Sequence, residues 1–223
     1  FSSKAHEYLI EQVQFDSPLN LSTESTQTFK LNFSHPVKEL IWVFFGTDRA
    51  SELIEPSTNG SNALLNKSFT AGTAQTDLGE QKNDYFNYSC GYKATGFTSV
   101  AGNISGSNIS NSTAAEHFGT FDLKLDNSSR FPVRKATYFR TCQPIQAGHR
   151  VPQKHIYLYS FALNAEDYQP SGTCNFSKVD SVELKFTDLG IISDANKRQL
   201  AVYAVNYNIL RIMSGMGGLA YTN

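Results

Sequence analysis

The sequence is short of charged residues, cysteines and long apolar runs, and each shortage argues against a class of protein. Charged residues make up 17% of the 223, and 19 Lys and Arg balance 20 Asp and Glu. Because there is no basic excess to neutralise many phosphates, we expect no direct binding to nucleic acid. The longest apolar run, residues 40–45, is far below the roughly 20 residues of a membrane-spanning helix, so we expect no transmembrane segment.

The three cysteines, Cys90, Cys142 and Cys174, are an odd and sparse set for a chain of this length. Secreted scaffolds that depend on disulfides carry even and denser sets, so we expect free thiols and folding in a reducing compartment. The chain begins at Phe1 without an initiator Met or a charged and apolar leader. We therefore expect it to be a fragment of a longer protein.

The sequence is rich in aromatic and β-branched residues, together with Ser, Thr and Asn. Aromatic residues reach 13%, with 11 Tyr and 16 Phe. This composition favours pleated strands joined by turns, and the length suits one β-rich domain. We expect residues 1–223 to form a single all-β domain.

Two segments alternate apolar and polar residues with the period of two that a half-buried strand requires. Their apolar members are Phe29, Leu31 and Phe33 in the first segment and Val182, Leu184 and Phe186 in the second. Further extended segments are predicted at 8–15, 40–45, 156–163 and 200–213. Each alternating segment should line a core with one face.

Between residues 46 and 130, Gly, Ser, Thr and Asn dominate, and only 85–88 and 118–125 resemble strands. Segments of such length inside a compact domain are usually functional or disordered, so we expect a loop-rich surface insertion at about 46–130. A short helix is expected over 133–141, ahead of Pro144. Several strands with long excursions between them predict an antiparallel eight-stranded jelly roll.

No constellation of residues supports catalysis, a cofactor or a metal ion, and we expect none of the three. Residues 215–220 fit the glycine-rich dinucleotide fingerprint, but only three residues follow, too few for its helix and acidic residue. We interpret this motif as a C-terminal turn. The five histidines do not pair with one another or with cysteines at the spacing of metal ligands. Isolated cysteines such as Cys142 and Cys174 are more often inert packing residues than nucleophiles.

Asn-x-Ser/Thr acceptor sites are unusually frequent and concentrate in the loop-rich region, where a glycosylating enzyme would have access. The candidate glycosylation sites are Asn59, Asn66, Asn103, Asn108, Asn111 and Asn127. Asn32 lies in a predicted strand and Asn175 in a compact turn, so a structural role explains both better.

Five stretches of the sequence resemble the major capsid proteins of nucleocytoplasmic large DNA viruses, the group that includes iridoviruses, phycodnaviruses and mimivirus relatives. The stretches lie near both ends of the chain, at 7–15, 33–43, 138–144, 156–163 with 169–180, and 203–221. The longest and most specific are QPSGTCNFSKVD at 169–180 and YAVNYNILRIMSGMGGLAY at 203–221.

The resemblance implies that the chain is the C-terminal jelly-roll half of a double jelly-roll structural subunit without enzymatic activity. Such subunits form homotrimers with a pseudo-hexameric outline. These capsomers meet neighbouring capsomers and minor capsid proteins, and they tile the icosahedral shell of a virion assembled in the host cytoplasm. The resemblance also implies that surface glycans of some members lie outside ordinary acceptor sites.

The alternative interpretation is a carbohydrate-binding β-sandwich surface module. The β-rich composition, the Asn-rich loops and the aromatic residues support it. It predicts a monomer that binds sugars, whereas the capsid interpretation predicts a subunit that assembles. The odd number of cysteines and the missing leader favour the capsid interpretation.

Overall fold

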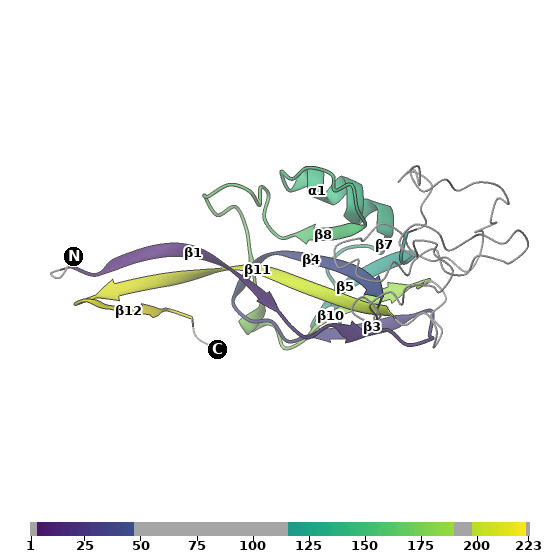
Figure 1. Ribbon diagram of the computed structural model, residues 1–223, viewed down its shortest axis with the longest axis horizontal. Helices are drawn as coiled ribbons and strands as arrows, with labels where there is room; N and C mark the ends of the chain where they lie inside the picture. The colour runs from purple at the N-terminus through teal and green to yellow at the C-terminus, as the bar shows by residue number, and fades with distance from the viewer. Residues whose placement is uncertain (1–3, 47–115, 190–197, 222–223) are drawn as a thin grey trace, which may run out of the picture.

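The computed structural model describes residues 4–46, 116–189 and 198–221, which form an antiparallel β-sandwich of two sheets (Figure 1). Four strands of the first sheet pair in the order β1-β11-β4-β8, with bounds His6–Phe15, Arg198–Met213, Pro36–Gly46 and Ile156–Ser160. Four strands of the second sheet pair in the order β3-β10-β5-β6, with bounds Gln27–Leu31, Val182–Thr187, Thr120–Leu125 and Ser128–Ser129. Apart from the hairpin of β5 and β6, neighbouring strands in these orders are distant in sequence, and this arrangement confirms the predicted antiparallel jelly roll.

Short elements extend this frame at its edges. The short strands are β2 (Leu19–Asn20) and β12 (Met216–Leu219) beside β11, β9 (Cys174–Asn175) beside β4, and β7 (Arg134–Lys135) beside β5. The helical elements are the π-helix η2 (Tyr138–Cys142), α1 (Gln143–Gln146) and the 3-10 helix η3 (Phe176–Lys178). None of these three elements is longer than five residues.

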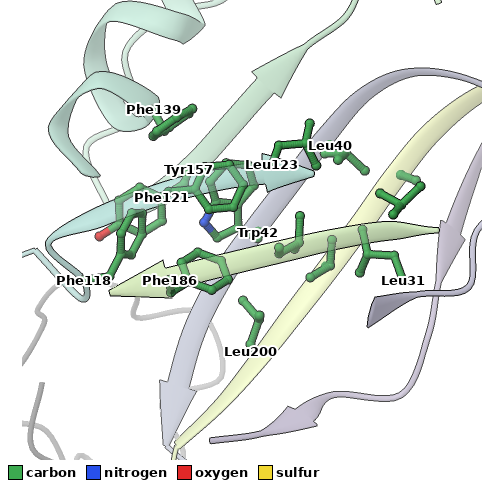
Figure 2. Packing of buried hydrophobic residues seen from close by; sticks show 14 of the residues in the cluster. Leu31, Leu40, Trp42, Phe118, Phe121, Leu123, Phe139, Tyr157, Phe186 and Leu200 are labelled. Carbon is green, nitrogen blue, oxygen red and sulfur yellow. The ribbon is translucent and has the colours of Figure 1, made fainter. Parts of the chain in front are cut away.

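Alternating side chains from the two sheets meet in one apolar core. In β10, Val182, Leu184 and Phe186 are buried while the residues between them are partly exposed, as their alternation predicted. Trp42 of β4 is fully buried and packs against Phe121 of the facing sheet, with ring centroids 4.7 Å apart (Figure 2). The offset and tilted rings fill the space between the sheets and add to the stability gained from burial.

The last part of the predicted loop-rich region, residues 116–130, belongs to the sandwich and contains β5 and β6. Phe118, Phe121 and Leu123 are fully buried, and β5 pairs with β10 over six residues. The strand expected at 118–125 is thus confirmed as β5, although a long polar stretch precedes it. Residues 47–115 lie outside the described part of the chain, as does the strand expected at 85–88.

The predicted helix at 133–141 is displaced toward the C-terminus. Residues 134–135 form β7, and the helical segment runs from Tyr138 through Pro144 to Gln146. Pro144 is the second residue of α1 and lies where the π-helix η2 passes directly into α1.

Two further segments differ from their predictions. The strand predicted to reach residue 163 ends at Ser160, because the Ser160 hydroxyl donates to the Ala162 carbonyl and accepts from the Ala162 N–H. The glycine-rich C-terminus forms a hairpin rather than a free turn. Ser214 and Gly215 adopt φ of 52° and 78° between the paired residues Met213 and Met216, which is the backbone of a two-residue hairpin loop.

Candidate assembly surface

Strands β1, β11 and β12 form a ribbon that extends beyond the second sheet and carries both ends of the chain (Figure 1). β1 pairs with β11 over all ten of its residues, from His6 with Ile212 to Phe15 with Tyr203. β11 has 16 residues, whereas the longest strand of the facing sheet has six. The ribbon is therefore longer than the sheet that could cover it.

One face of the ribbon carries an exposed row of apolar side chains. Leu200, Val202 and Ala204 of β11 point into the core, so the alternate residues of β11 and their partners on β1 point outward. We call this row the outer stripe; its cross-strand pairs are Leu9 with Ile209, Val13 with Val205, and Phe15 with Tyr203.

The exposure of the outer stripe is high for apolar residues. Leu9 is 50% exposed, Val13 64% and Phe15 50%. The rings of Phe15 and Tyr203 stack with centroids 4.8 Å apart, so part of the stripe is already ordered in the free chain. The pair of Glu11 and Tyr207 lies between Leu9 and Val13 on this face, so one charged residue interrupts the stripe. Exposed apolar residues gathered on one face in this way are candidates for contact with another protein.

The opposite face of the ribbon is also apolar near its tip. Tyr8, Leu210 and Leu219 lie side by side across β1, β11 and β12, and Tyr8 and Leu219 are 45% and 40% exposed. Met213 and Met216 at the hairpin are 55% and 73% exposed. Apolar side chains are therefore exposed on both faces of the ribbon tip.

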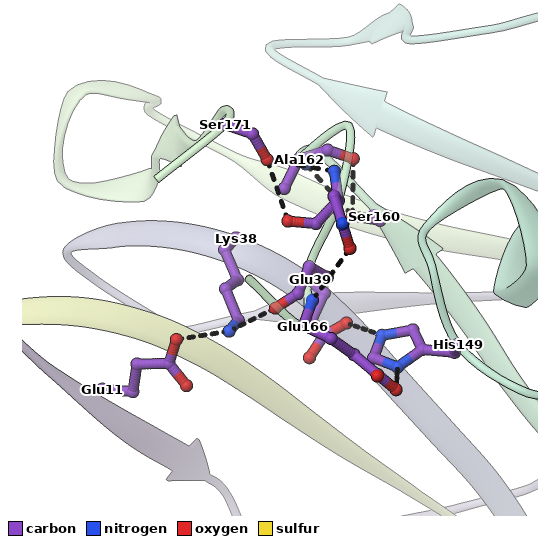
Figure 3. Close-up of polar contacts among 10 residues, drawn as sticks. Glu11, Lys38, Glu39, His149, Ser160, Ala162, Glu166 and Ser171 are labelled. Carbon is purple, nitrogen blue, oxygen red and sulfur yellow. Dashed lines mark hydrogen bonds and ion pairs between the residues drawn. The ribbon is translucent and has the colours of Figure 1, made fainter. Parts of the chain in front are cut away.

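A buried lysine lies beside the outer stripe. The side chain of Lys38 is 5% exposed, and its ammonium group pairs with Glu11 of β1 at 2.5 Å (Figure 3). The same group donates to the Ala165 carbonyl at 2.7 Å and lies 5.5 Å from the centre of the Tyr207 ring. These partners compensate for the burial of the charge, and they tie β1, β4 and the segment around Ala165 together.

A histidine between two carboxylates holds the same segment over the sheet (Figure 3). His149 lies 2.8 Å from Glu39 and 2.9 Å from Glu166 through its two ring nitrogens. Burial lowers the pKa of His149, but its hydrogen bonds to Glu39 and Glu166 raise that pKa more, so the net shift is upward. When it is protonated, the ring can donate to both carboxylates at once and so links β4 to the segment that carries Glu166.

Of the six candidate glycosylation sites, only Asn127 lies in the described part of the chain. It is exposed and occupies the turn between β5 and β6 with φ 62°. The other five sites lie outside the described residues, and so does Cys90. Asn175 accepts a hydrogen bond from the Ser177 N–H, as its predicted place in a compact turn implies. Asn32 is exposed and lies one residue after β3.

Cys142 and Cys174 are free thiols.

One side-chain cluster was missed by the sequence analysis. His117 and His155 are 38 positions apart in sequence, yet their ring centroids lie 5.5 Å apart in the interior, close to Glu116, Tyr157 and Arg198. No spacing rule could have found this cluster, because the fold brings together residues from separate segments.

Across residues 4–46, 116–189 and 198–221, no three His, Cys, Asp or Glu side chains gather as metal ligands would. No helix within these ranges is long and apolar enough to span a bilayer.

Comparison with known proteins places this sandwich in one family. The model of the large eukaryotic DNA virus major capsid protein family matches residues 1–218. The major capsid protein of Phaeocystis pouchetii virus is 36% identical over 256 residues, covering 98% of this chain and 49% of that protein. The major capsid protein of Paramecium bursaria Chlorella virus 1 is 35% identical over 254 residues, covering 100% of this chain and 50% of that protein.

A solved structure shows the same arrangement. The quasi-atomic model of the PBCV-1 virus capsid matches with a TM-score of 0.64 and 31% identity, over 99% of this chain and 52% of the solved chain. The chain thus spans about half the length of the relatives that it matches. Matches over nearly the whole chain, in sequence and in fold, show that it belongs to the large eukaryotic DNA virus major capsid protein family.

Proposed function

We propose that the chain is the C-terminal jelly-roll part of a structural major capsid protein and forms part of a virion shell. The observation that carries this proposal is the family match over residues 1–218. The sandwich suits such a role, because two sheets packed about 10 Å apart make a stiff slab that can meet its neighbours at fixed angles. A structural role requires no catalytic group.

We propose further that the full-length subunit forms a homotrimer, a capsomer that contacts neighbouring capsomers and minor capsid proteins. The outer stripe and the ribbon tip are the described surfaces best suited to these contacts, because they are exposed and apolar. A stable association needs a total interface of about 1,200 Å² or more. One ribbon alone offers a narrow surface, so the second jelly roll of the subunit would have to contribute.

The oligomeric state tests this proposal. Sedimentation velocity at micromolar concentration is expected to give a monomer for the 223-residue chain and a trimer for the full-length protein. Electron microscopy of the full-length protein should then show capsomers or shells. A stable trimer of the short chain would contradict the need for the second jelly roll, and a monomeric full-length protein would contradict the capsomer itself.

We also propose that the segment 47–115 faces outward from the shell, and that this segment and the turn after β5 carry glycans. Its Gly, Ser, Thr and Asn content could not bury enough apolar area for a second core. The proposed attachment sites are Asn59, Asn66, Asn103, Asn108, Asn111 and Asn127. Mass spectrometry of protein from particles is expected to find glycan masses on peptides that contain these residues. Six unmodified asparagines would exclude this use of the acceptor sites.

The carbohydrate-binding alternative has weaker support. A groove of about 390 Å³ lies between η2, α1 and the end of β8, and aromatic residues such as Tyr138, Tyr159 and Phe161 line it. Aromatic rings of this kind could bind a sugar. The family match, however, covers the sandwich as a whole and therefore supports the capsid role more strongly.

A further inference from the structure

The cluster around His117 lies at the end of β11 opposite the ribbon tip, where several strands begin or end. Arg198 is the first residue of β11, and it pairs with Gly46, the last residue of β4. His155 immediately precedes β8, and His117 lies three residues before β5. The cluster therefore joins elements of both sheets at one end of the sandwich.

The hydrogen bonding of His117 fixes its charge. Its side chain is buried, and a guanidinium nitrogen of Arg198 lies 3.2 Å from its Nδ1. A guanidinium group only donates hydrogen bonds, so Nδ1 of His117 must accept and carries no proton. The ring is consequently neutral, with its single proton on Nε2. Protonating Nδ1 would break this bond and place two positive charges next to each other.

The other surroundings of His117 are also unfavourable to a second proton. The Phe44 ring stacks on it with centroids 5.2 Å apart, and the His155 ring stands perpendicular to it at 5.5 Å. Within the described ranges, Nε2 of His117 is buried without a hydrogen-bond partner. The pKa of His117 is held well below its usual range. Burial is the largest cause, followed by the charge of Arg198 and then by His155.

The nearest carboxylate is already engaged by other groups. Glu116 accepts a hydrogen bond from Arg140 at 2.8 Å and another from the Tyr157 hydroxyl at 2.9 Å. The Thr137 hydroxyl also donates to Glu116 at 3.5 Å, and Nε2 of His155 lies 3.8 Å from it. The Tyr157 oxygen in turn accepts from the backbone N–H of His117 at 3.2 Å. Glu116 therefore braces the cluster through Arg140 and Tyr157 without contacting the His117 ring.

We propose that His117 and Arg198 form an acid-sensitive latch, which holds this end of the sandwich closed at neutral pH and releases it when His117 takes up a proton. Release would separate Arg198 from the 116–119 segment that leads into β5. Residues 47–115 connect Gly46 to Glu116, so both ends of that connection lie at the latch. The latch would make this end of the sandwich the first to loosen in acid. This inference does not depend on the proposed capsid function.

Linkage gives the sign and size of the effect. The unfolded chain takes up a proton at His117 below about pH 6.5, whereas the closed fold does not, so stability is present above this pH and lost as the pH falls. For one such group, the unfolding equilibrium constant should rise about tenfold between pH 7.5 and 5.5. Keeping the pH above about 5.5 limits interference from carboxylates, whose ordinary pKa values lie near 4.

The substitution His117→Asn tests the latch in the 223-residue chain. Asparagine keeps an oxygen that accepts from Arg198 but does not titrate. Urea unfolding at pH 7.5 and 5.5 should show the unfolding constant of the wild type rising about tenfold relative to that of the variant. Equal pH profiles for the two chains would overturn the proposal.

His149→Gln is the matched control, because it removes a titrating histidine whose effect has the opposite sign. The pKa of His149 is raised in the fold, so its contribution to stability is fully present below about pH 6.5 and lost as the pH rises through the folded pKa. Relative to the wild type, this variant should therefore lose more stability in acid than at high pH. The two substitutions should shift the pH profile in opposite directions.

Two measurements on the wild type keep the test decisive even if His117→Asn does not fold. The NMR signal of the His117 ring should stay in its neutral position down to pH 5.5. Hydrogen exchange, corrected for its intrinsic pH dependence, should quicken from pH 7.5 to 5.5 at residues 116–119 and 198–201 before it quickens at 205–212. A His117 ring that titrates near pH 6.5 in the folded chain, or exchange that quickens first at 205–212, would refute the latch.

Discussion

The Trp42→Ala chain is expected to lose about 4 kcal/mol of its free energy of unfolding. Trp42 is fully buried between the sheets, with ring centroids 4.7 Å from Phe121, 5.6 Å from Phe139 and 6.3 Å from Phe186. Alanine would leave a cavity lined by rings that cannot collapse without moving both sheets. Because domains of this kind are stable by about 5–15 kcal/mol, the loss is a large share of the total.

Urea unfolding followed by circular dichroism measures this loss, because the variant lacks the single tryptophan that fluorescence would report. Trp42→Phe is the matched variant. It keeps an aromatic ring and removes an indole N–H that is buried without a hydrogen-bond partner in the described ranges, so it should cost less than Trp42→Ala. Tyr168→Ala, at a fully exposed side chain, should change stability by less than about 0.5 kcal/mol. Equal losses for Trp42→Ala and Tyr168→Ala would show that the core is elsewhere.

The sequence predicted the strands whose two faces differ. Val182, Leu184 and Phe186 form the buried face of β10, and their period of two is visible without any structure. The segment 118–125 was recognised as strand-like in the same way, although polar sequence precedes it, and it forms β5 with Phe121 and Leu123 in the core. Prediction was less accurate at the ends of elements, where the helix expected over 133–141 begins later.

The candidate surfaces depend on pairings that a single sequence does not encode locally. The outer stripe exists because β1 pairs with β11, so that Val13 lies opposite Val205. Arg198 contacts His117 across 81 positions. Glu39 is a further example. Its carboxylate is buried in a largely apolar strand, and its partner His149 comes from another segment of the chain. Such contacts are consequences of the completed topology.

The largest effect on assembly is expected from a charge in the outer stripe. In the full-length protein, Val13→Asp should raise the dissociation constant of the trimer at least about 100-fold, which corresponds to about 2.7 kcal/mol. Val13 is 64% exposed in the free chain, so the substitution should change the stability of the 223-residue chain by less than about 0.5 kcal/mol. In an apolar contact, however, the carboxylate would lose its water without gaining a partner.

Leu163→Asp is the matched control, because it introduces the same charge at an apolar residue that is 81% exposed and lies outside the ribbon. Sedimentation velocity over a range of concentrations should show wild-type trimers for Leu163→Asp and monomers for Val13→Asp. Circular dichroism should show that both variants fold. The reverse pattern, in which Val13→Asp trimerises normally and Leu163→Asp does not, would place the contact on the segment after β8. In that case the outer stripe must be covered at a later stage, when capsomers meet, since a row of Leu9, Val13 and Phe15 left in water would invite aggregation.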